Sequence, residues 1–345
     1  MLKRIIWLFM ALVLLLLAAS AYWVYRPLPM NSQVVDLAIE PQTTVRGIAK
    51  ASVSAGIEVD PQLLFVFFKL SGQSRALRAG SYEIAQGESA LDLLRKLSRG
   101  EESLKAISLI DGWTFRQFRA ALAKAEGLKH DTKDLSDEAL MAQLGMPGVA
   151  PEGRFFPDTY TYGKGASELH VMQRAANAMT KQLAAAWGQR QPDIQIKTID
   201  EALILASIIE KETGRESDRT TISRVFHNRL AIDMPLQTDP TVIYGMFDSF
   251  DGNLRRVDLR TDHPWNTYTR KGLPPTPIAM PGRNALKAAV KPAPSNALYF
   301  VAKGDGTSHF SATLEEHNAG VNRYQRRTTG ASTGTSSTAA SGAGQ

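Results

Sequence analysis

The chain has 345 residues, 43% of them hydrophobic and 21% charged, which is the composition of a globular protein with room for about two domains. It contains no cysteine, and this excludes disulfide bonds, a thiol nucleophile and thiolate metal ligands. The formal net charge is +6, but the lysines and arginines are scattered and form no basic cluster with interleaved aromatic residues, so we expect no nucleic-acid partner.

The N-terminus predicts a membrane anchor. Lys3 and Arg4 precede an uncharged run over residues 5–25, and about 20 apolar residues in a helix span a hydrocarbon core of about 30 Å. Aromatic residues lie near both ends of the run, as at membrane interfaces. The short basic segment, residues 1–4, should stay in the cytoplasm, so the remainder is translocated. A signal peptide cleaved near residues 19–21 is the alternative, but the length of the run favours an uncleaved anchor.

A short linker over residues 27–33 is expected next, and then a strand–turn–helix pattern recurs three times. Each unit alternates apolar residues and then offers a Ser or Thr that can cap a helix. The alternating pairs are Leu37 and Ile39, Tyr82 and Ile84, and Ile107 and Leu109, followed by Thr44, Ser89 and Thr114. A further helix is expected over residues 61–73. These signals predict a small α+β module over residues 34–100, although generic α/β packing would explain the repeat as well.

The following region is expected to be mostly helical over residues 120–195, with breaks at Gly145, Pro147 and Pro151. Residues 152–160 are aromatic, polar and loop-like, and such a loop either lines a ligand site or covers a core. At the other end of the chain, residues 328–345 contain only Thr, Gly, Ala, Ser and a final Gln, so we expect a disordered tail without chemistry.

Glu210 is the candidate for acid–base chemistry. Thr198 and Glu201 fit a capping box, and the apolar run that follows over residues 202–209 predicts a buried helix. Glu210 follows this run directly, and a carboxylic acid in an apolar wall resists ionisation, so it can act as a general acid near neutral pH. The alternative is a salt bridge at the end of the helix with Lys211, Arg215 or Arg219. Helix geometry alone slightly favours that alternative.

The region after Glu210 is rich in groups that suit a sugar ligand. A second helix is expected around Ile222 to Leu230, with a polar face of Arg224, His227, Asn228 and Arg229. Residues 236–245, 266–268 and 272–275 then offer amides, hydroxyls and aromatic rings, which provide directional hydrogen bonds and a flat stacking face. Turn structure alone would explain the prolines and glycines among them.

The ordered motifs resemble those of one family. They are residues 210–213, 225–230, 236–245, 266–268, 272–275 and 281–282, preceded by residues 152–153 and 156–160 and followed by residues 308–310 and 317–318. Over residues 35–327 the chain resembles the YceG-like endolytic murein transglycosylases. The chain departs from the family pattern at Trp265, where a smaller aromatic is expected, and at Thr276, where Gly is usual.

The resemblance implies an α+β fold with an N-terminal transmembrane helix, a LysM-like module over residues 34–100 and a catalytic α+β domain over residues 101–327. It implies that Glu210 is the catalytic acid and base. It further implies a substrate cleft lined by residues that match motif positions of the family: Glu152, Gln237, Thr238, Asp239, Tyr244 and Asn266. Asp239 is a candidate for orienting the site and Tyr244 for stacking or a hydrogen bond, and a buried cap or a core contact is the alternative for each.

The implied reaction is endolytic cleavage between N-acetylmuramic acid and N-acetylglucosamine (MurNAc–GlcNAc) in nascent peptidoglycan, which leaves a 1,6-anhydroMurNAc end and terminates elongation. The implied location is the cell inner membrane, with the catalytic domain in the periplasm near peptidoglycan synthases. A hydrolytic muramidase and a non-catalytic peptidoglycan-binding scaffold remain the alternatives.

We expect no metal and no cofactor, because the chain has no histidine pair spaced like a metalloprotease motif, no nucleophile-elbow serine and no glycine-rich phosphate loop. The six histidines are His130, His170, His227, His263, His309 and His317.

Overall fold

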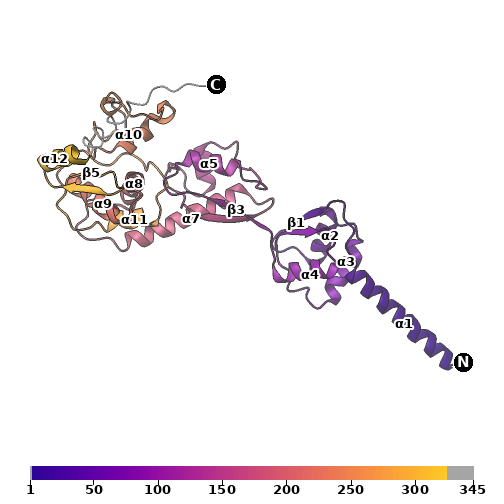
Figure 1. Ribbon diagram of the computed structural model, residues 1–345. Coiled ribbons are helices and arrows are strands. Elements are labelled where there is room, and N and C mark those ends of the chain that lie inside the picture. Colours follow the sequence, from indigo (N-terminus) through magenta and orange to yellow (C-terminus); the bar gives the residue numbers. More distant parts are fainter. Residues whose placement is uncertain (1, 325–345) are drawn as a thin grey trace, which may run out of the picture. The chain divides into compact units, whose positions relative to one another are not determined.

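The computed structural model describes residues 2–324, and the segment predicted to be a disordered tail lies outside them. The chain is a mixed α+β protein, as predicted (Figure 1). Its residues form two compact units. Among the described residues, the first contains residues 2–107 together with Leu122–Asp131 and Tyr160–His170, and the second contains Ser108–Ala121, Thr132–Thr159 and residues 171–324. The predicted domain limits, 34–100 and 101–327, therefore stay a prediction, because this division interleaves the two ranges.

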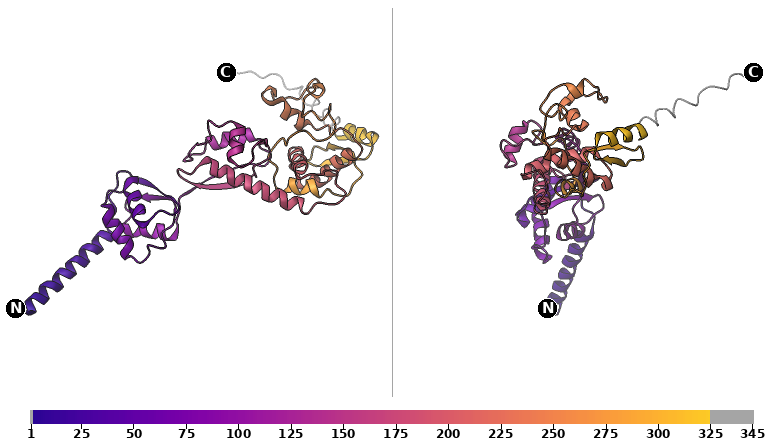
Figure 2. Two further views of the ribbon diagram at one scale, coloured as in Figure 1. Left: turned by 180° about the vertical axis from the view of Figure 1, so that it is seen from behind. Right: turned by 90° about the vertical axis from the view of Figure 1, so that its left-hand side faces the viewer.

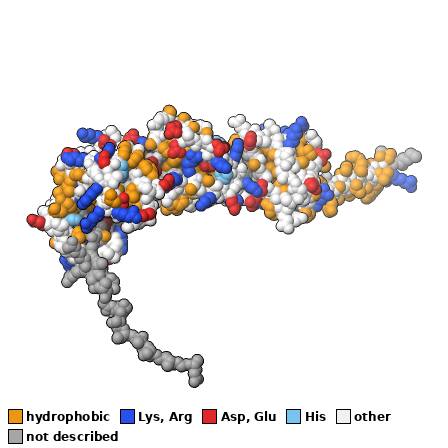
Figure 3. Space-filling view, turned by 90° about the horizontal axis from the view of Figure 1, so that it is seen from above, with side chains coloured by type: hydrophobic (Ala, Val, Ile, Leu, Met, Phe, Trp, Pro, Cys, Tyr) orange, Lys and Arg blue, Asp and Glu red, His pale blue; other side chains and the backbone are white. Residues whose placement is uncertain are grey.

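The anchor prediction corresponds to α1 (Leu2–Tyr25). Its segment Lys3–Tyr25 is long and apolar enough to cross a membrane, and hydrophobic side chains cover it in the space-filling view (Figure 3). The helix makes no packing contact along most of its length, and only its last turn is partly covered, at Trp23 and Val24. Such a helix is consistent with a single-pass membrane anchor.

The segment after α1 differs from the predicted linker. Leu28 is only 5% exposed and lies in the core of the first unit. Its N–H donates to the carbonyl of Glu88 at 2.8 Å, and the N–H of Glu58 donates to the carbonyl of Pro29 at 2.8 Å. The linker interpretation is therefore wrong: two prolines suggested a spacer, but Leu28 supplies an apolar side chain that the core buries.

The core of the first unit is built on an antiparallel pair, β1 (Val34–Ile39) and β2 (Gly80–Ala85), with Val34 opposite Ala85 and Ile39 opposite Gly80. The chain between them forms α2 (Val45–Ala55) and α3 (Pro61–Leu70), and α4 (Ala90–Arg99) follows (Figure 2). Thr44 and Ser89 cap α2 and α4 as predicted, since each hydroxyl accepts a backbone N–H of its helix.

The middle of the chain is less helical than expected. It contains α5 (Phe115–Ala123), α6 (Asp137–Gln143) and α7 (Glu168–Trp187), but also β4 (Thr159–Gly163), which pairs with β3 (Leu104–Ser108). Tyr160 and Tyr162 alternate with exposed residues in β4 and are buried. The alternation was itself a strand signal, but it was missed because Thr159 and Tyr160 were interpreted together with the aromatic and polar loop that precedes them.

The second unit is centred on α8 (Ile199–Glu212), which the predicted capping box of Thr198 and Glu201 starts. Seven of its residues are buried, and it packs against α9 (Glu216–Ala231), α10 (Asp239–Met246) and α11 (Arg283–Val290) (Figure 1). The remaining elements are the 3-10 turns η1 (Phe247–Ser249) and η2 (Asp258–Arg260), the antiparallel pair β5 (Tyr299–Ala302) and β6 (Ser308–Ser311), and α12 (Leu314–Tyr324). The apolar helix that carries Glu210 is thus the centre of this core.

Candidate active site

Glu210 occupies the C-terminal turn of α8, and its side chain is only 7% exposed. Its Oε2 accepts a hydrogen bond from the backbone N–H of Gly282 at 2.8 Å. Arg219, from α9, places Nη1 3.6 Å from the same oxygen. The structure therefore has features of both sequence interpretations, the buried acid and the salt bridge. The carboxyl is buried at the end of an apolar helix, and it also faces Arg219, one of the three predicted cationic partners.

A single irregular segment, residues 278–282, contacts the surroundings of Glu210. The N–H of Ile278 donates to Ser207 Oγ of α8 at 3.0 Å, four residues before the Gly282 contact. On its other side, Met280 exchanges two backbone hydrogen bonds with the turn before α5: its carbonyl accepts from Gly112 at 2.8 Å, and its N–H donates to Trp113 at 2.7 Å. The segment therefore holds the turn at residues 111–113 next to the end of α8.

Asp111 lies in that turn and is a second carboxyl at the site, which the sequence interpretation missed. A Cβ atom on Gly282 would come within 2.6 Å of Asp111 Oδ1, so glycine is required for this close approach. Gly282 thus contacts both carboxyls, with its N–H on Glu210 and its Cα against Asp111. No sequence signal marked Asp111, because an Asp-Gly pair before a helix cap reads as an ordinary turn.

The electrostatics of Glu210 favour its protonated form. Burial raises the pKa of Glu210 above its usual range, and the nearby carboxylate of Asp111 raises the pKa further. The Gly282 hydrogen bond and the cations of Arg219 and Lys211 act in the opposite direction. Burial also raises the pKa of Asp111. The result is an acid that keeps its proton to higher pH than an exposed glutamate, next to a cation that stabilises the carboxylate left after transfer.

Glu152, one of the predicted cleft residues, is 6% exposed. The N–H of Phe115 donates to both of its carboxyl oxygens, at 3.0 and 3.2 Å, and the hydroxyl of Tyr244 is a further partner. Burial raises the pKa of Glu152 to about 7 despite these donors. The Lys211 cation lowers the pKa of both Glu152 and Glu210, so the two carboxyls share it as a neighbour.

Tyr244 belongs to an aromatic cluster with Phe247 and Trp265, whose ring centroids lie 5.5–5.7 Å apart. The two departures from the family pattern meet here, because Trp265 Nε1 donates to Thr276 Oγ1 at 2.9 Å. Phe247 is 55% exposed and has a left-handed backbone, with φ of 48°. An exposed ring held in a strained conformation beside a polar site suits stacking against a sugar.

The segment at the start of α10 contains three of the predicted cleft residues, Gln237, Thr238 and Asp239. Gln237 is exposed and has a left-handed φ of 49°, which is uncommon for a non-glycine residue. The hydroxyl of Thr238 donates to the carboxyl of Glu212, and Asp239 accepts a hydrogen bond from the hydroxyl of Tyr268 at 2.6 Å. Their predicted contact with substrate stays a prediction.

Glu212 was not predicted as a site residue, because it points away from Glu210 on the helix. The structure places its carboxyl against Thr238. Burial raises the pKa of Glu212 to about 7, and the neighbouring Asp239 raises it as well. The sequence signals for it were its spacing of two residues from Glu210 and its place in the motif at residues 210–213.

Asn266 is fully buried, and its side-chain amide is committed to its own loop. Nδ2 donates to the carbonyls of Asp258, Leu259 and Thr261 at 2.8–3.3 Å, and Oδ1 accepts from the N–H of Tyr268. These bonds give the loop its shape and hold Tyr268 near Asp239. The predicted contact of Asn266 with substrate is not tested by this geometry.

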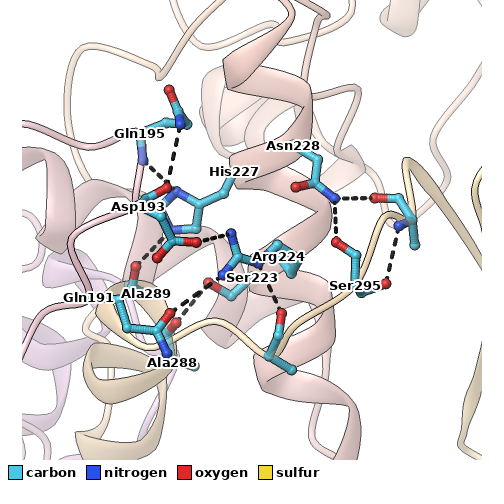
Figure 4. Close-up of polar contacts among 12 residues, drawn as sticks. Gln191, Asp193, Gln195, Ser223, Arg224, His227, Asn228, Ala288, Ala289 and Ser295 are labelled. Carbon is cyan, nitrogen blue, oxygen red and sulfur yellow. Dashed lines mark hydrogen bonds and ion pairs between the residues drawn. The ribbon is translucent and has the colours of Figure 1, made fainter.

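The polar face of α9 is a scaffold for the core. His227 accepts from the N–H of Gln195 and donates from Nε2 to Ala289, Ser223 donates to Ala288, and Asn228 donates to Ser295 and Ala297 (Figure 4). Burial lowers the pKa of His227, in keeping with a neutral ring in this arrangement. These side chains bind backbone groups of α11, of the segment after it and of the segment before α8, so they hold α9 to its neighbours.

No group of three His, Asp or Glu side chains is arranged to hold a metal ion among residues 2–324. The side chains around Glu210 carry carboxyl groups, hydroxyls and cations.

Comparison with known proteins gives consistent matches. The family model described as the YceG-like family matches residues 37–323. A curated protein of Bacillus subtilis named endolytic murein transglycosylase is 30% identical over 85% of this chain and 86% of its own length. One of the same name from Streptococcus pneumoniae is 28% identical over 89% of this chain and 63% of its own. A crystal structure of a yceG-like protein from Listeria monocytogenes superposes with a TM-score of 0.52 at 28% identity, over 84% of this chain and 99% of that one.

Proposed function

The chain belongs to the YceG-like family, and from this premise we propose that it is a membrane-anchored endolytic transglycosylase of peptidoglycan, with Glu210 as its acid and base. The cleaved bond joins N-acetylmuramic acid to N-acetylglucosamine, and the product ends in 1,6-anhydroMurNAc. The observation that carries this proposal is the buried carboxyl of Glu210, held by the N–H of Gly282 beside Arg219.

The first chemical step requires a protonated carboxyl near neutral pH. Burial and the Asp111 carboxylate favour the protonated form of Glu210, which delivers its proton to the bridging oxygen as the glycosidic bond breaks. The positive charge that develops at C1 is stabilised by the acetamido group of the substrate itself.

The second step uses the carboxylate that the first has produced. Glu210, stabilised by Arg219 and the Gly282 N–H, accepts the proton of the muramic C6 hydroxyl, and the oxygen closes on C1. Protons balance, because the one given to the leaving oxygen is replaced by the one from C6. No water is consumed, so one carboxyl performs both steps.

Asp111 favours a second candidate function, a hydrolytic muramidase of the same specificity. Hydrolytic glycosidases mostly use two carboxyls, and Asp111 approaches the same glycine that binds Glu210. In this alternative Asp111 activates a water molecule, and the product carries a reducing end. The names of the relatives support transglycosylation instead.

The proposed location of the enzyme rests on α1 and the basic residues before it. Lys3 and Arg4 precede the span, which supports a cytoplasmic N-terminus and a catalytic region on the periplasmic side of the inner membrane. There the substrate is nascent peptidoglycan, and the synthases that extend it are proposed partners, so that cutting terminates elongation.

We assign residues 34–100 a LysM-like role in holding glycan. The support is the order of elements, because α2 and α3 lie in the chain between the paired strands β1 and β2. Residues 101–327 would then form the catalytic domain.

Product analysis in water enriched in oxygen-18 tests the reaction. Purified glycan strands are digested with the full-length protein in detergent, and the new ends are measured by mass spectrometry. The proposal predicts anhydro ends, which weigh 18 Da less than reducing ends of the same length, without incorporated oxygen-18. Reducing ends labelled with oxygen-18 would establish the muramidase, and uncut strands that remain bound would establish a scaffold.

A further inference from the structure

α3 carries an exposed apolar stripe at the end of the membrane anchor. Leu63, Val66 and Leu70 are 51%, 47% and 83% exposed, although each is a large hydrophobic residue. The opposite side of α3 is buried in the core through Leu64 and Phe68. The helix is therefore apolar on two sides, of which the core covers one.

The stripe is fixed in position by a contact between α3 and α1. The rings of Trp23 and Phe67 pack edge-to-face, with centroids 5.7 Å apart. Leu63 and Leu70 precede and follow Phe67 by four and three residues, so they lie on the same side of α3, about 6 Å and about 4.5 Å away along its axis. Both leucines thus lie within a short distance of the last turn of the anchor.

The depth of Trp23 in the membrane sets the depth of the stripe. The 23-residue segment Lys3–Tyr25 is about 35 Å long, slightly longer than the hydrocarbon core of about 30 Å. Its last turn, with Tyr22, Trp23 and Tyr25, therefore reaches the interfacial layer, where such rings are favoured.

The connection between α1 and the first unit keeps this geometry. Leu28 is buried in the core three residues after α1 ends, and its N–H binds Glu88. The helix also packs against α4. The first unit is thus attached directly to the anchor, without a flexible linker that would let α3 move away from the membrane surface.

Basic side chains lie on and just after α3. Lys69 and Arg75 are exposed, residues 61–79 contain no acidic residue, and the exposed carboxylate of Asp60, one turn before Leu63, caps the helix by binding the N–H of Gln62. Basic side chains beside an apolar helix face are the pattern of interfacial helices that bind anionic headgroups.

We propose that Leu63, Val66 and Leu70 of α3 dip into the interfacial layer of the bilayer that α1 spans, so that the first unit rests on the membrane through two helices. The occupant is lipid, because the stripe continues the surface that α1 already presents to lipid. This contact is independent of the reaction at Glu210, and either can fail without the other.

Single-cysteine labelling tests the contact cleanly, because the natural chain has no cysteine. Leu63→Cys and Leu70→Cys carry an environment-sensitive fluorophore in the full-length protein. The matched control is Leu104→Cys, because Leu104 is an exposed leucine of the same unit, at 50%. It follows Ser103, whose N–H donates to the carbonyl of Ser81, near the end of β2 that is remote from the anchor. The proteins are reconstituted in vesicles of phosphatidylcholine and phosphatidylglycerol that contain lipid with a nitroxide near the headgroup end of the acyl chain.

The expected result is quenching at positions 63 and 70 at least threefold stronger than at position 104. Equal, weak quenching at all three positions would overturn the proposal. A stripe covered by a second copy of the chain would give weak quenching at 63 and 70 together with fluorescence self-quenching between labelled molecules, and this outcome overturns it as well.

Discussion

At the scale of single residues, the candidate site holds the carboxyls of Glu210 and Asp111 on either side of one glycine. Gly282 donates its N–H to Glu210 and leaves room for Asp111. The positive charge of Arg219 lowers the pKa of both acids. The first acid was predictable from its helix, since burial of residues 202–209 follows from their apolar run. Asp111 was not, because its partner Gly282 lies 171 positions later and only tertiary structure joins them.

Replacing Asp111 by Asn is expected to shift the pH–rate profile. The ionised Asp111 repels the ionised form of Glu210 and so raises its pKa, and the amide removes this effect. Glu210 in the variant then loses its proton at lower pH, while Arg219 and Lys211 continue to lower its pKa. The high-pH limb of the profile, on which activity falls as pH rises, should shift to lower pH by about 0.5–1 pH unit.

The measurement is the rate of strand cleavage between pH 4 and 9, with Asp158→Asn as the control. Asp158 raises the pKa of Asp111 but is not among the groups that act on Glu210, so the control should leave the limb in place. A uniformly lower rate with an unshifted limb would show that Asp111 acts through structure alone.

At the scale of elements, α8 and the segment 278–282 form the frame of the site. The helix, its capping box and its burial were predictable, because an apolar run with a cap is a strong local signal. The segment 278–282 could not be predicted, because it belongs to no regular helix or strand. It is held by hydrogen bonds with Ser207, Gly112 and Trp113, which are remote in sequence. The missed strand β4 and the buried segment around Leu28 have the same cause, in that tertiary packing decided their structure.

Gly282→Ala is expected to lower both activity and stability. Its φ of −77° suits alanine, so the backbone tolerates the change, but the new methyl group would lie 2.6 Å from Asp111 Oδ1. The turn must move, at a cost of about 1–3 kcal/mol in unfolding free energy, and the cleavage rate should fall at least about tenfold as the two acids separate. Urea unfolding and strand cleavage measure the two effects.

Gly214→Ala is the matched control, because Gly214 lies just after α8 and a Cβ atom added there would meet no other atom within 4 Å. It should leave both quantities near the wild-type values. The double variant Asp111→Ala/Gly282→Ala removes the overlap and should be more stable than the sum of the single changes predicts. Strict additivity would argue against a direct contact between the two positions.

At the scale of the whole molecule, the chain combines a membrane anchor with a glycan-cutting site. The anchor could be predicted because a bilayer imposes a length and a composition that few soluble segments share. Family membership could be predicted because the motifs around Glu210 are long and ordered. The close attachment of the first unit to the anchor could not be predicted. Leu28 is a single apolar residue between two prolines, and only the folded core shows that it is buried.

The central claim is that Glu210 performs both proton transfers, and the most direct measurement is the rate at which full-length Glu210→Gln releases 1,6-anhydroMurNAc ends from purified strands. Glu216→Gln, the same change at an exposed site at the start of α9, is the control for folding and handling. The account predicts a loss of about 10²–10⁴-fold for Glu210→Gln and none for Glu216→Gln. Anhydro ends released by Glu210→Gln at a rate close to the wild type would contradict it.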